Sequence, residues 1–137
     1  MKLFFVSFFI IMISMVVIDG AWLIVMHKRF YAPHIGHLLK ASIEIFPAII
    51  FYLIFGIALN VFVVLPALKH HTGYLELIFL GLLFGMVTYG TYDLTNQATL
   101  KSWPWIVTIT DIIWGSCLAS VLSSISVFLT RYFLLVL

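Results

Sequence analysis

The chain has 137 residues, of which 64% are hydrophobic and only 9% are charged, and its mean hydropathy is +1.22. These values lie far outside the range of water-soluble domains and exclude that class. The net charge of +2 is small and scattered over short loops, which argues against a nucleic-acid surface. The composition therefore predicts an integral membrane protein whose solvent is lipid.

Four apolar segments are long enough to cross a bilayer, because a transmembrane helix needs about 20 mostly apolar residues. They are residues 3–26, 41–68, 74–97 and 103–130. What lies between them is too short for a soluble domain. The sequence thus predicts a single integral membrane domain over residues 1–137, an all-α, antiparallel four-helix transmembrane bundle with short loops.

The first predicted helix, residues 3–26, has the basic start and apolar run of a signal peptide. However, no Ala-x-Ala-like cleavage site follows, Asp19 interrupts the run, and residues 22–26 extend it to a full spanning length. We therefore expect a retained transmembrane helix. The membrane face at its start is called face A here, and the face at its end is called face B.

The connection after this helix, residues 27–40, lies on face B. It contains His34 and His37, which together with carboxylates are candidates to bind a transition metal such as zinc, iron or manganese. The alternative is an interfacial loop with solvated histidines, since the chain has neither a His-Glu-x-x-His motif nor a pair of cysteines. A divalent metal is the one cofactor that the sequence leaves as a candidate.

The other three predicted helices carry polar and small residues at helical spacing. On helix 41–68, Glu44 is followed by Ala48, Phe51 and Tyr52. On helix 74–97, steps of three and four residues join Gly81, Gly85, Tyr89, Tyr92, Asp93 and Asn96. On helix 103–130, similar steps join Thr108, Asp111, Gly115, Ala119 and Ser123. Small residues permit close helix contact, so these stripes are predicted to face one another.

The two signs of charge occupy different places along the chain. All seven bases lie outside or at the ends of the predicted spans, whereas all five acids fall within them. An ionised carboxylate near the bilayer centre costs roughly 2.5 to 3.5 kcal/mol, so intramembrane acids are candidates for function. Because successive helices alternate in direction, Asp19, Glu44, Asp93 and Asp111 are expected within roughly 5 to 12 Å of face B, and Glu76 towards face A. With no Lys or Arg to pair with them, these acids are expected to share protons or hold a cation.

These patterns predict an inward-facing ligand site in the half of the bundle nearest face B. Its predicted members are Asp19, Trp22, Glu44, Tyr52, Tyr89, Tyr92, Asp93, Asn96, Asp111 and Trp114. Carboxylates beside aromatic rings favour an organic ammonium or another polar cationic group. The alternative is that the acids hold the helices together and the rings are core or interfacial residues.

The function remains open between three classes. The first binds a small cationic or polar ligand, as a proton-coupled small-solute transporter does. The second is a membrane-embedded lipid-modifying enzyme that uses a metal or acid–base groups. The third is a non-catalytic accessory subunit of a membrane complex. No Ser, Cys or Thr stands in a recognisable triad, so the sequence leans away from an enzyme. The expected partners are the lipid bilayer, the ligand, and a second copy or another membrane protein, without nucleic acid.

The basic residues give a small orientation bias. Face B carries Lys28, Arg29, Lys40 and Lys101, and face A carries Lys2, Lys69 and Arg131. By the positive-inside rule this leans towards face B as cytoplasmic, with both termini outside.

Several runs of residues also resemble a known family. They are Asp19-Gly20-Ala21-Trp22-Leu23, Phe51-Tyr52 with Gly56, Gly90-Thr91-Tyr92-Asp93-Leu94-Thr95-Asn96-Gln97-Ala98-Thr99-Leu100, Trp103-Pro104 and Asp111-Ile112-Ile113-Trp114-Gly115. The chain resembles, over nearly its whole length, the predicted membrane proteins of domain-of-unknown-function family 2177. The resemblance implies a bacterial four-helix integral membrane protein, hence the inner (cytoplasmic) membrane. It implies no reaction and no ligand.

Overall fold

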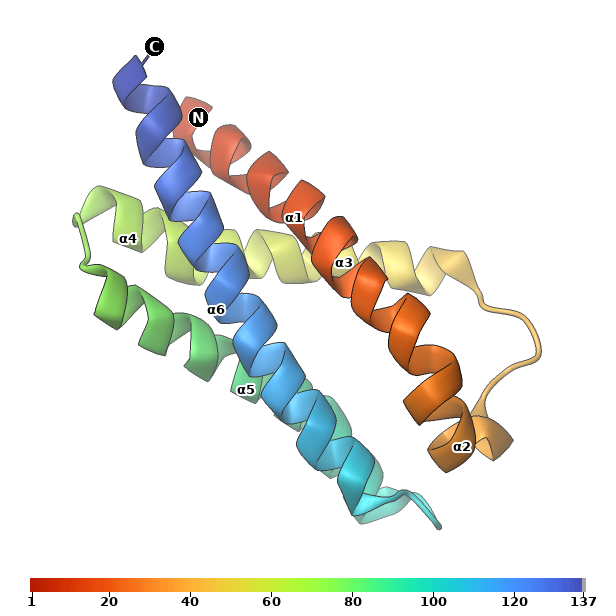
Figure 1. The fold of residues 1–137 in the computed structure, drawn as a ribbon. Helices are drawn as coiled ribbons and strands as arrows, with labels where there is room; N and C mark the ends of the chain where they lie inside the picture. The colour runs from red at the N-terminus through yellow and green to blue at the C-terminus, as the bar shows by residue number, and fades with distance from the viewer. Residues whose placement is uncertain (137) are drawn as a thin grey trace.

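A computed structural model describes residues 1–136 (Figure 1). All regular structure in this part of the chain is helical, and four of its helical segments are long and apolar enough to cross a membrane. The predicted class, an all-α transmembrane bundle of four helices, is confirmed.

The first span is longer than the sequence predicted. Helix α1 (Lys2–Met26) continues without a break into the π-helical segment η1 (His27–Tyr31), the short helix α2 (Ala32–Ile35) and the 3₁₀ turn η2 (Gly36–Leu38). The prediction of a loop directly after residue 26 is therefore wrong. No Gly or Pro occurs from His27 to Ala32, so nothing there stops the helix before it reaches face B.

The second span runs through α3 (Ile45–Leu59), the π-helical segment η3 (Asn60–Val64) and α4 (Leu65–Lys69). It begins later than the predicted residue 41, which leaves Glu44 just outside it. Pro47 does not break the helix, because it lies in the first turn, where backbone N–H groups have no partner within the helix.

Each π-helical segment ends two residues before a proline, Pro33 after η1 and Pro66 after η3. A proline inside a helix lacks a donor and crowds the carbonyl group four residues earlier, which here belongs to Arg29 or Phe62. Both carbonyl groups lie in the middle of a π-helical segment. The wider π turn thus accommodates the proline and lets each span continue.

The third and fourth spans, α5 (Tyr74–Thr99) and α6 (Trp105–Val136), pack closely against each other. A Cβ atom added to Gly85 would lie 2.1 Å from the carbonyl oxygen of Gly115, and one added to Gly81 would lie 2.5 Å from Cα of Ser120. Only glycine allows the two backbones to approach this closely. The predicted contact between the two small-residue stripes is confirmed.

The bundle is packed more tightly near face A than near face B. Figure 1 shows α1 and α6 side by side near the chain termini and diverging towards α2, while the second span crosses the other helices. The second span contacts α1, α5 and α6 through η3. Fully buried side chains of the core include Ile11, Met15, Leu59, Leu118 and Leu122.

A set of buried polar groups joins three spans within this tight half. The hydroxyl group of Ser7 donates to Oδ1 of Asn60 at 2.7 Å, and Nδ2 of Asn60 donates to the carbonyl oxygen of Phe4 at 3.0 Å. The hydroxyl group of Ser126 donates to the backbone carbonyl of Ser7 at 3.0 Å. All three polar side chains are fully buried, so these bonds fix the register between α1, η3 and α6.

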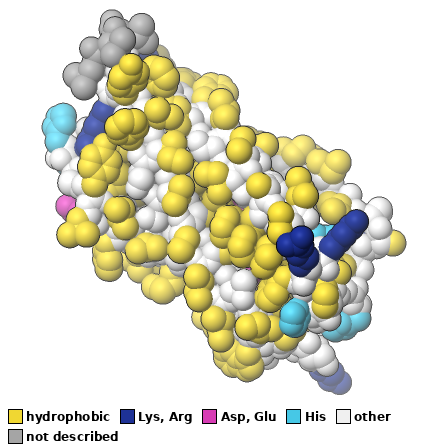
Figure 2. Space-filling view, viewed as in Figure 1, with side chains coloured by type: hydrophobic (Ala, Val, Ile, Leu, Met, Phe, Trp, Pro, Cys, Tyr) yellow, Lys and Arg dark blue, Asp and Glu magenta, His cyan; other side chains and the backbone are white. Residues whose placement is uncertain are grey.

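The surface is that of an integral membrane protein. In Figure 2, hydrophobic side chains cover the face between the two ends of the molecule, and Lys, Arg and His side chains gather near those ends. Arg131, on α6, donates to the backbone carbonyl oxygens of Ala67 at 3.2 Å and Thr72 at 3.1 Å. It therefore ties α6 to the turn between the second and third spans on face A.

Candidate functional site

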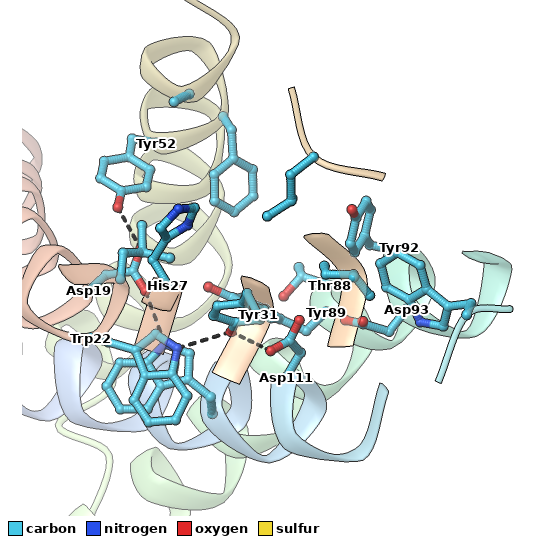
Figure 3. Close-up of a pocket in the computed structure, with 17 residues that line it drawn as sticks. Asp19, Trp22, His27, Tyr31, Tyr52, Thr88, Tyr89, Tyr92, Asp93 and Asp111 are labelled. Atoms are coloured by element: carbon cyan, nitrogen blue, oxygen red, sulfur yellow. Dashed lines mark hydrogen bonds between the residues drawn. The ribbon is translucent and has the colours of Figure 1, made fainter. Parts of the chain in front are cut away.

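A cavity of about 540 Å³ lies in the half of the bundle nearest face B, where α1 and α6 diverge (Figure 3). Residues of all four spans line it, together with Leu39 just after η2 and Trp103 just before α6. The polar and aromatic lining residues are Asp19, Trp22, His27, Tyr31, Phe51, Tyr52, Thr88, Tyr89, Tyr92, Asp93, Trp103, Asp111 and Trp114. Such a volume lies within the range of about 300 to 1,000 Å³ that is typical of sites for small organic molecules.

Asp19 is held in place by two hydrogen bonds. Its side chain is only 4% exposed. Oδ1 accepts a hydrogen bond from Nε1 of Trp114 at 2.9 Å, and Oδ2 accepts one from the hydroxyl group of Tyr52 at 2.5 Å. Each oxygen of this carboxylate therefore has a donor, and the three residues connect α1, α3 and α6.

A second chain of hydrogen bonds joins the first and fourth spans on the face B side of the cavity. Nε1 of Trp22 donates to the hydroxyl oxygen of Tyr31 at 3.1 Å, and that hydroxyl group donates to Oδ1 of Asp111 at 2.5 Å. The indole rings of Trp22 and Trp114 stack with centroids 4.0 Å apart and an interplanar angle of 8°. Tyr31 on η1 thus joins the first span to the fourth.

The two Asp-x-x-Trp sequences explain this arrangement. Helices α1 and α6 run in opposite directions, so the order of Asp and Trp along one helix is reversed relative to the other. The reversal brings Asp19 beside Trp114, and Trp22 towards Asp111, with Tyr31 bridging the second pair. Since one helical turn separates Asp from Trp in both helices, the two indoles meet face to face.

Asp93 differs from the other two carboxylates in the cavity. Its side chain is 0% exposed, yet neither Oδ1 nor Oδ2 has a hydrogen-bond partner among residues 1–136. Its carboxylate and that of Asp111 turn into the cavity (Figure 3), and the described residues make no hydrogen bond to Oδ2 of Asp111. Buried polar atoms are nearly always hydrogen-bonded, so the unpartnered carboxylate of Asp93 is unusual among the buried polar groups of this chain.

The lining contains three carboxylates and no Lys or Arg. The aromatic rings and aliphatic side chains around them keep most of the wall apolar. Carboxylates in such surroundings can hold a cation or exchange protons, and the faces of the rings attract cations as well.

The structure brings together eight of the ten residues that the sequence proposed. Glu44 does not line the cavity: it is exposed, it precedes α3, and it pairs with Lys40. The prediction that it lies inside the second span is wrong, because that helix starts only at Ile45. Asn96 does not line the cavity either, since it lies about one turn beyond Tyr92 and Asp93, towards the end of α5.

The histidines on the face B side do not gather with the carboxylates. Nδ1 of His34 lies 2.7 Å from the carbonyl oxygen of Phe30, and His37 is exposed. Among residues 1–136, no group of three or more His, Cys, Asp or Glu side chains has an arrangement that could hold a metal ion. His27, which the sequence analysis did not single out, lines the cavity.

Tyr31 and Trp103 are the most important residues that the sequence analysis missed. Tyr31 lies in a segment that was expected to form a loop, and Trp103 was noted only as the first residue of the fourth predicted span and in the run Trp103-Pro104. The available signal for Tyr31 was its place in a connection already expected to lie over the carboxylates. Its hydroxyl group could have been proposed as a donor to one of them.

The fold and this site define a small polytopic helical membrane protein with an intramembrane cavity lined by carboxylates and aromatic rings. The chain belongs to the family described as predicted membrane protein (DUF2177), whose model matches residues 4–128. Neither the comparison with curated proteins nor that with solved structures gave a match.

Proposed function

We propose that this protein binds a small organic cation in the cavity near face B, with Asp93 and Asp111 as its counter-ions. The observation that carries the proposal is the burial of the Asp93 carboxylate without any partner on either oxygen. A bound ammonium group supplies both the missing positive charge and N–H donors for these oxygens.

The charge and the rings of the lining favour a cation over an anion or a neutral solute. No lining side chain is a Lys or Arg that would attract an anion. Tyr89 and the stacked pair of Trp22 and Trp114 offer aromatic surface next to the carboxylates. Cation–π contacts contribute up to about 2 kcal/mol where water is excluded.

Asp19 has a different role in this proposal. Because both of its oxygens already accept hydrogen bonds, it positions Tyr52 and Trp114 and does not contact the ligand directly. Its charge still adds to the negative potential of the cavity.

The proposal extends to transport in which the cation and protons move in a coupled way. Carboxylates that exchange a proton for a cation are typical of proton-coupled transporters. The family resemblance makes the cytoplasmic membrane of a bacterium the proposed location. Uptake of a radiolabelled organic cation into proteoliposomes, with and without an imposed pH gradient, tests the transport step separately from binding.

Binding itself is tested by thermal unfolding of the detergent-purified protein at constant ionic strength. Ethylammonium supplies both the charge and N–H donors, whereas tetramethylammonium and choline supply the charge without N–H donors. The uncharged control is 3,3-dimethyl-1-butanol, which has the shape of choline. A ligand that binds only the folded state stabilises it, by about 2.7 kcal/mol at 100 times its dissociation constant. We expect a cation to raise the midpoint in the wild type and in Glu44→Gln, but not in Asp93→Asn.

Two results would overturn the proposal. One is the absence of any stabilisation by the organic cations, or an equal stabilisation in Asp93→Asn. The other is a large loss of stability in ligand-free Asp93→Asn, which would mean that Asp93 holds the helices together, as expected for an accessory subunit.

A further inference from the structure

We propose that the ligand is an amphiphile dissolved in the bilayer, with one cationic amino head and an apolar chain, and that it enters sideways from the lipid between α3 and α5. This inference rests on the proposed function, because the amino head occupies the site of Asp93 and Asp111. It adds the substrate class and the route of entry.

The face B end of the cavity is partly covered, with His27 and Leu39 as the exposed lining residues on that side. Ile35 of α2, Trp103 and Val107 form a buried hydrophobic cluster on the face B side, against which Phe30 and Tyr31 pack. The hydroxyl group of Tyr31 is also bonded to both Trp22 and Asp111. A solute arriving from water past Ile35 and Trp103 would have to open this cluster and break these hydrogen bonds.

The side towards the lipid is open. All residues from 41 to 51 are exposed, so the first turns of α3 stand away from the rest of the bundle. These turns of α3 leave a gap between α3 and α5. On the face A side of this gap, the ring of Phe55 packs against Phe84 and Tyr89, with centroid distances of 5.4 and 6.3 Å. Contacts between the second span and α5 lie at Phe55 and at η3, further towards face A.

The cavity reaches the lipid through this gap. Ala48 and Phe51 on α3 and Tyr92 on α5 are exposed at the surface and also line the cavity. Figure 3 shows Tyr52 and Tyr92 on opposite sides of the cavity, on these two helices. Ala48, Phe51 and Tyr92 lie within the two spans, from about one to two turns inside the ends of α3 and α5. We expect lipid chains beside them, where only an apolar segment of a ligand is stable.

The amino head and the apolar chain of such a ligand thus occupy separate parts of the cavity. The carboxylates of Asp93 and Asp111 lie at the inner end, and the exit between Ala48, Phe51 and Tyr92 is apolar apart from the tyrosine hydroxyl group. A fully hydrophilic cation would fill only the inner end. An alkylamine fills the inner end with its ammonium group and the exit with its chain.

The native tryptophans allow a direct test of occupancy. The chain has four tryptophans, and three of them, Trp22, Trp103 and Trp114, line the cavity. The fourth, Trp105, is 62% exposed and does not line it, so a Trp105→Phe variant leaves fluorescence from the cavity alone. The probe is an alkylamine that carries a nitroxide group on its chain, because a nitroxide quenches tryptophan fluorescence at short range. The control is the alcohol with the same nitroxide-bearing chain.

In lipid vesicles reconstituted with Trp105→Phe, we expect the amine to quench at least tenfold more effectively than the alcohol at equal membrane content. Asp93→Asn should abolish this difference. Ala48→Phe, which narrows the exit, should reduce quenching by the amine, whereas Ile49→Phe should leave it unchanged, since Ile49 is exposed and does not line the cavity.

These experiments distinguish a failure of the proposed ligand class, of the entry route and of the cation site itself. Equal quenching by amine and alcohol, together with stabilisation by short amines that depends on Asp93, would overturn lateral binding of an amphiphile and leave the cation site intact. The amine could instead quench more than the alcohol, with Ala48→Phe and Ile49→Phe changing this quenching to the same extent. That result would overturn the entry route between α3 and α5. If no amine of any length has an effect that depends on Asp93, the proposed function fails as well.

Discussion

At the scale of single residues, Asp19 and Asp93 show that two buried carboxylates in one cavity can have opposite roles. Asp19 accepts a hydrogen bond on each oxygen, whereas Asp93 accepts none. The sequence marks both as intramembrane acids and does not distinguish them. The difference lies in which donors the neighbouring helices bring within reach.

The same substitution is therefore expected to give different results at the two sites. Asp19→Asn replaces an acceptor by an NH₂ group that faces a donor, either Trp114 or Tyr52, and should lower the free energy of unfolding by about 1 to 3 kcal/mol. Asp93→Asn removes no hydrogen bond and should leave the stability of the ligand-free protein unchanged or higher. Thermal unfolding in detergent measures both, with Glu44→Gln as the exposed control. Equal losses at both positions would contradict this prediction.

At the scale of helical elements, the close contact of α5 with α6 depends on glycines at their crossing. Gly85 lies directly against the backbone of Gly115 and Ser116, while Gly20 in the middle of α1 has no atom within 4 Å of an added Cβ. Gly85 therefore serves as the test position for a substitution by alanine, and Gly20 as its control.

Gly85→Ala should push α5 away from α6 and destabilise the protein by about 1 to 3 kcal/mol, as expected for overpacking. Gly20→Ala should be neutral or stabilising by up to about 1 kcal/mol, because alanine is the better helix former. Unfolding midpoints of the two variants in the same detergent test the difference. Similar midpoints would mean that α5 and α6 do not approach as closely as described.

The π-helical segment η3 is the second element whose effect on stability can be tested. It places Asn60 between α1 and α6, where its side chain bonds to Ser7 and to the backbone of Phe4. We expect Ser7→Ala and Asn60→Leu to be coupled by about 0.5 to 3 kcal/mol in a double-mutant cycle, because each removes one partner of the same hydrogen bond.

The control for this cycle combines Asn60→Leu with Thr91→Val. Thr91 is exposed on α5 and donates only to the carbonyl oxygen of Val87 in its own helix. These two changes should be additive within about 0.5 kcal/mol. Additivity of the Ser7 pair as well would show that the buried bond is energetically unimportant.

At the scale of the whole molecule, four spans place both ends of the described chain on face A. The turn between the second and third spans lies on face A, and residues 39–44 and 100–104 lie on face B. The charge bias predicts that face B is cytoplasmic.

Labelling of spheroplasts with an impermeant maleimide tests this topology. The native Cys117 is replaced by Ala, and single cysteines are introduced as His70→Cys on face A or Ser42→Cys on face B, both at exposed positions. We expect His70→Cys to react in intact spheroplasts and Ser42→Cys only after permeabilisation. The reverse pattern would invert the orientation, and reaction of both would contradict the four-span topology.

The candidate site could be predicted in part because its chemistry is visible in the sequence. Acids in apolar helices are costly, and alternating helix directions place Asp19, Asp93 and Asp111 at a similar depth whatever the details of packing. The depth argument failed for Glu44, because the start of the second span depended on where the preceding turn ends. It also could not find Tyr31, since the helical continuation through η1 was not expected.

The sequence by itself determined the membrane class, the number of spans, the small-residue contact and most of the acids and rings of the cavity. These follow from hydropathy and helical periodicity, which are local properties of the chain. Only the tertiary structure decided that Asp19 has a donor on each oxygen and Asp93 has none among residues 1–136, that Tyr31 bridges Trp22 and Asp111, and that the first turns of α3 are exposed. Those features depend on how helices distant in the sequence cross and diverge, and no local pattern specifies that geometry.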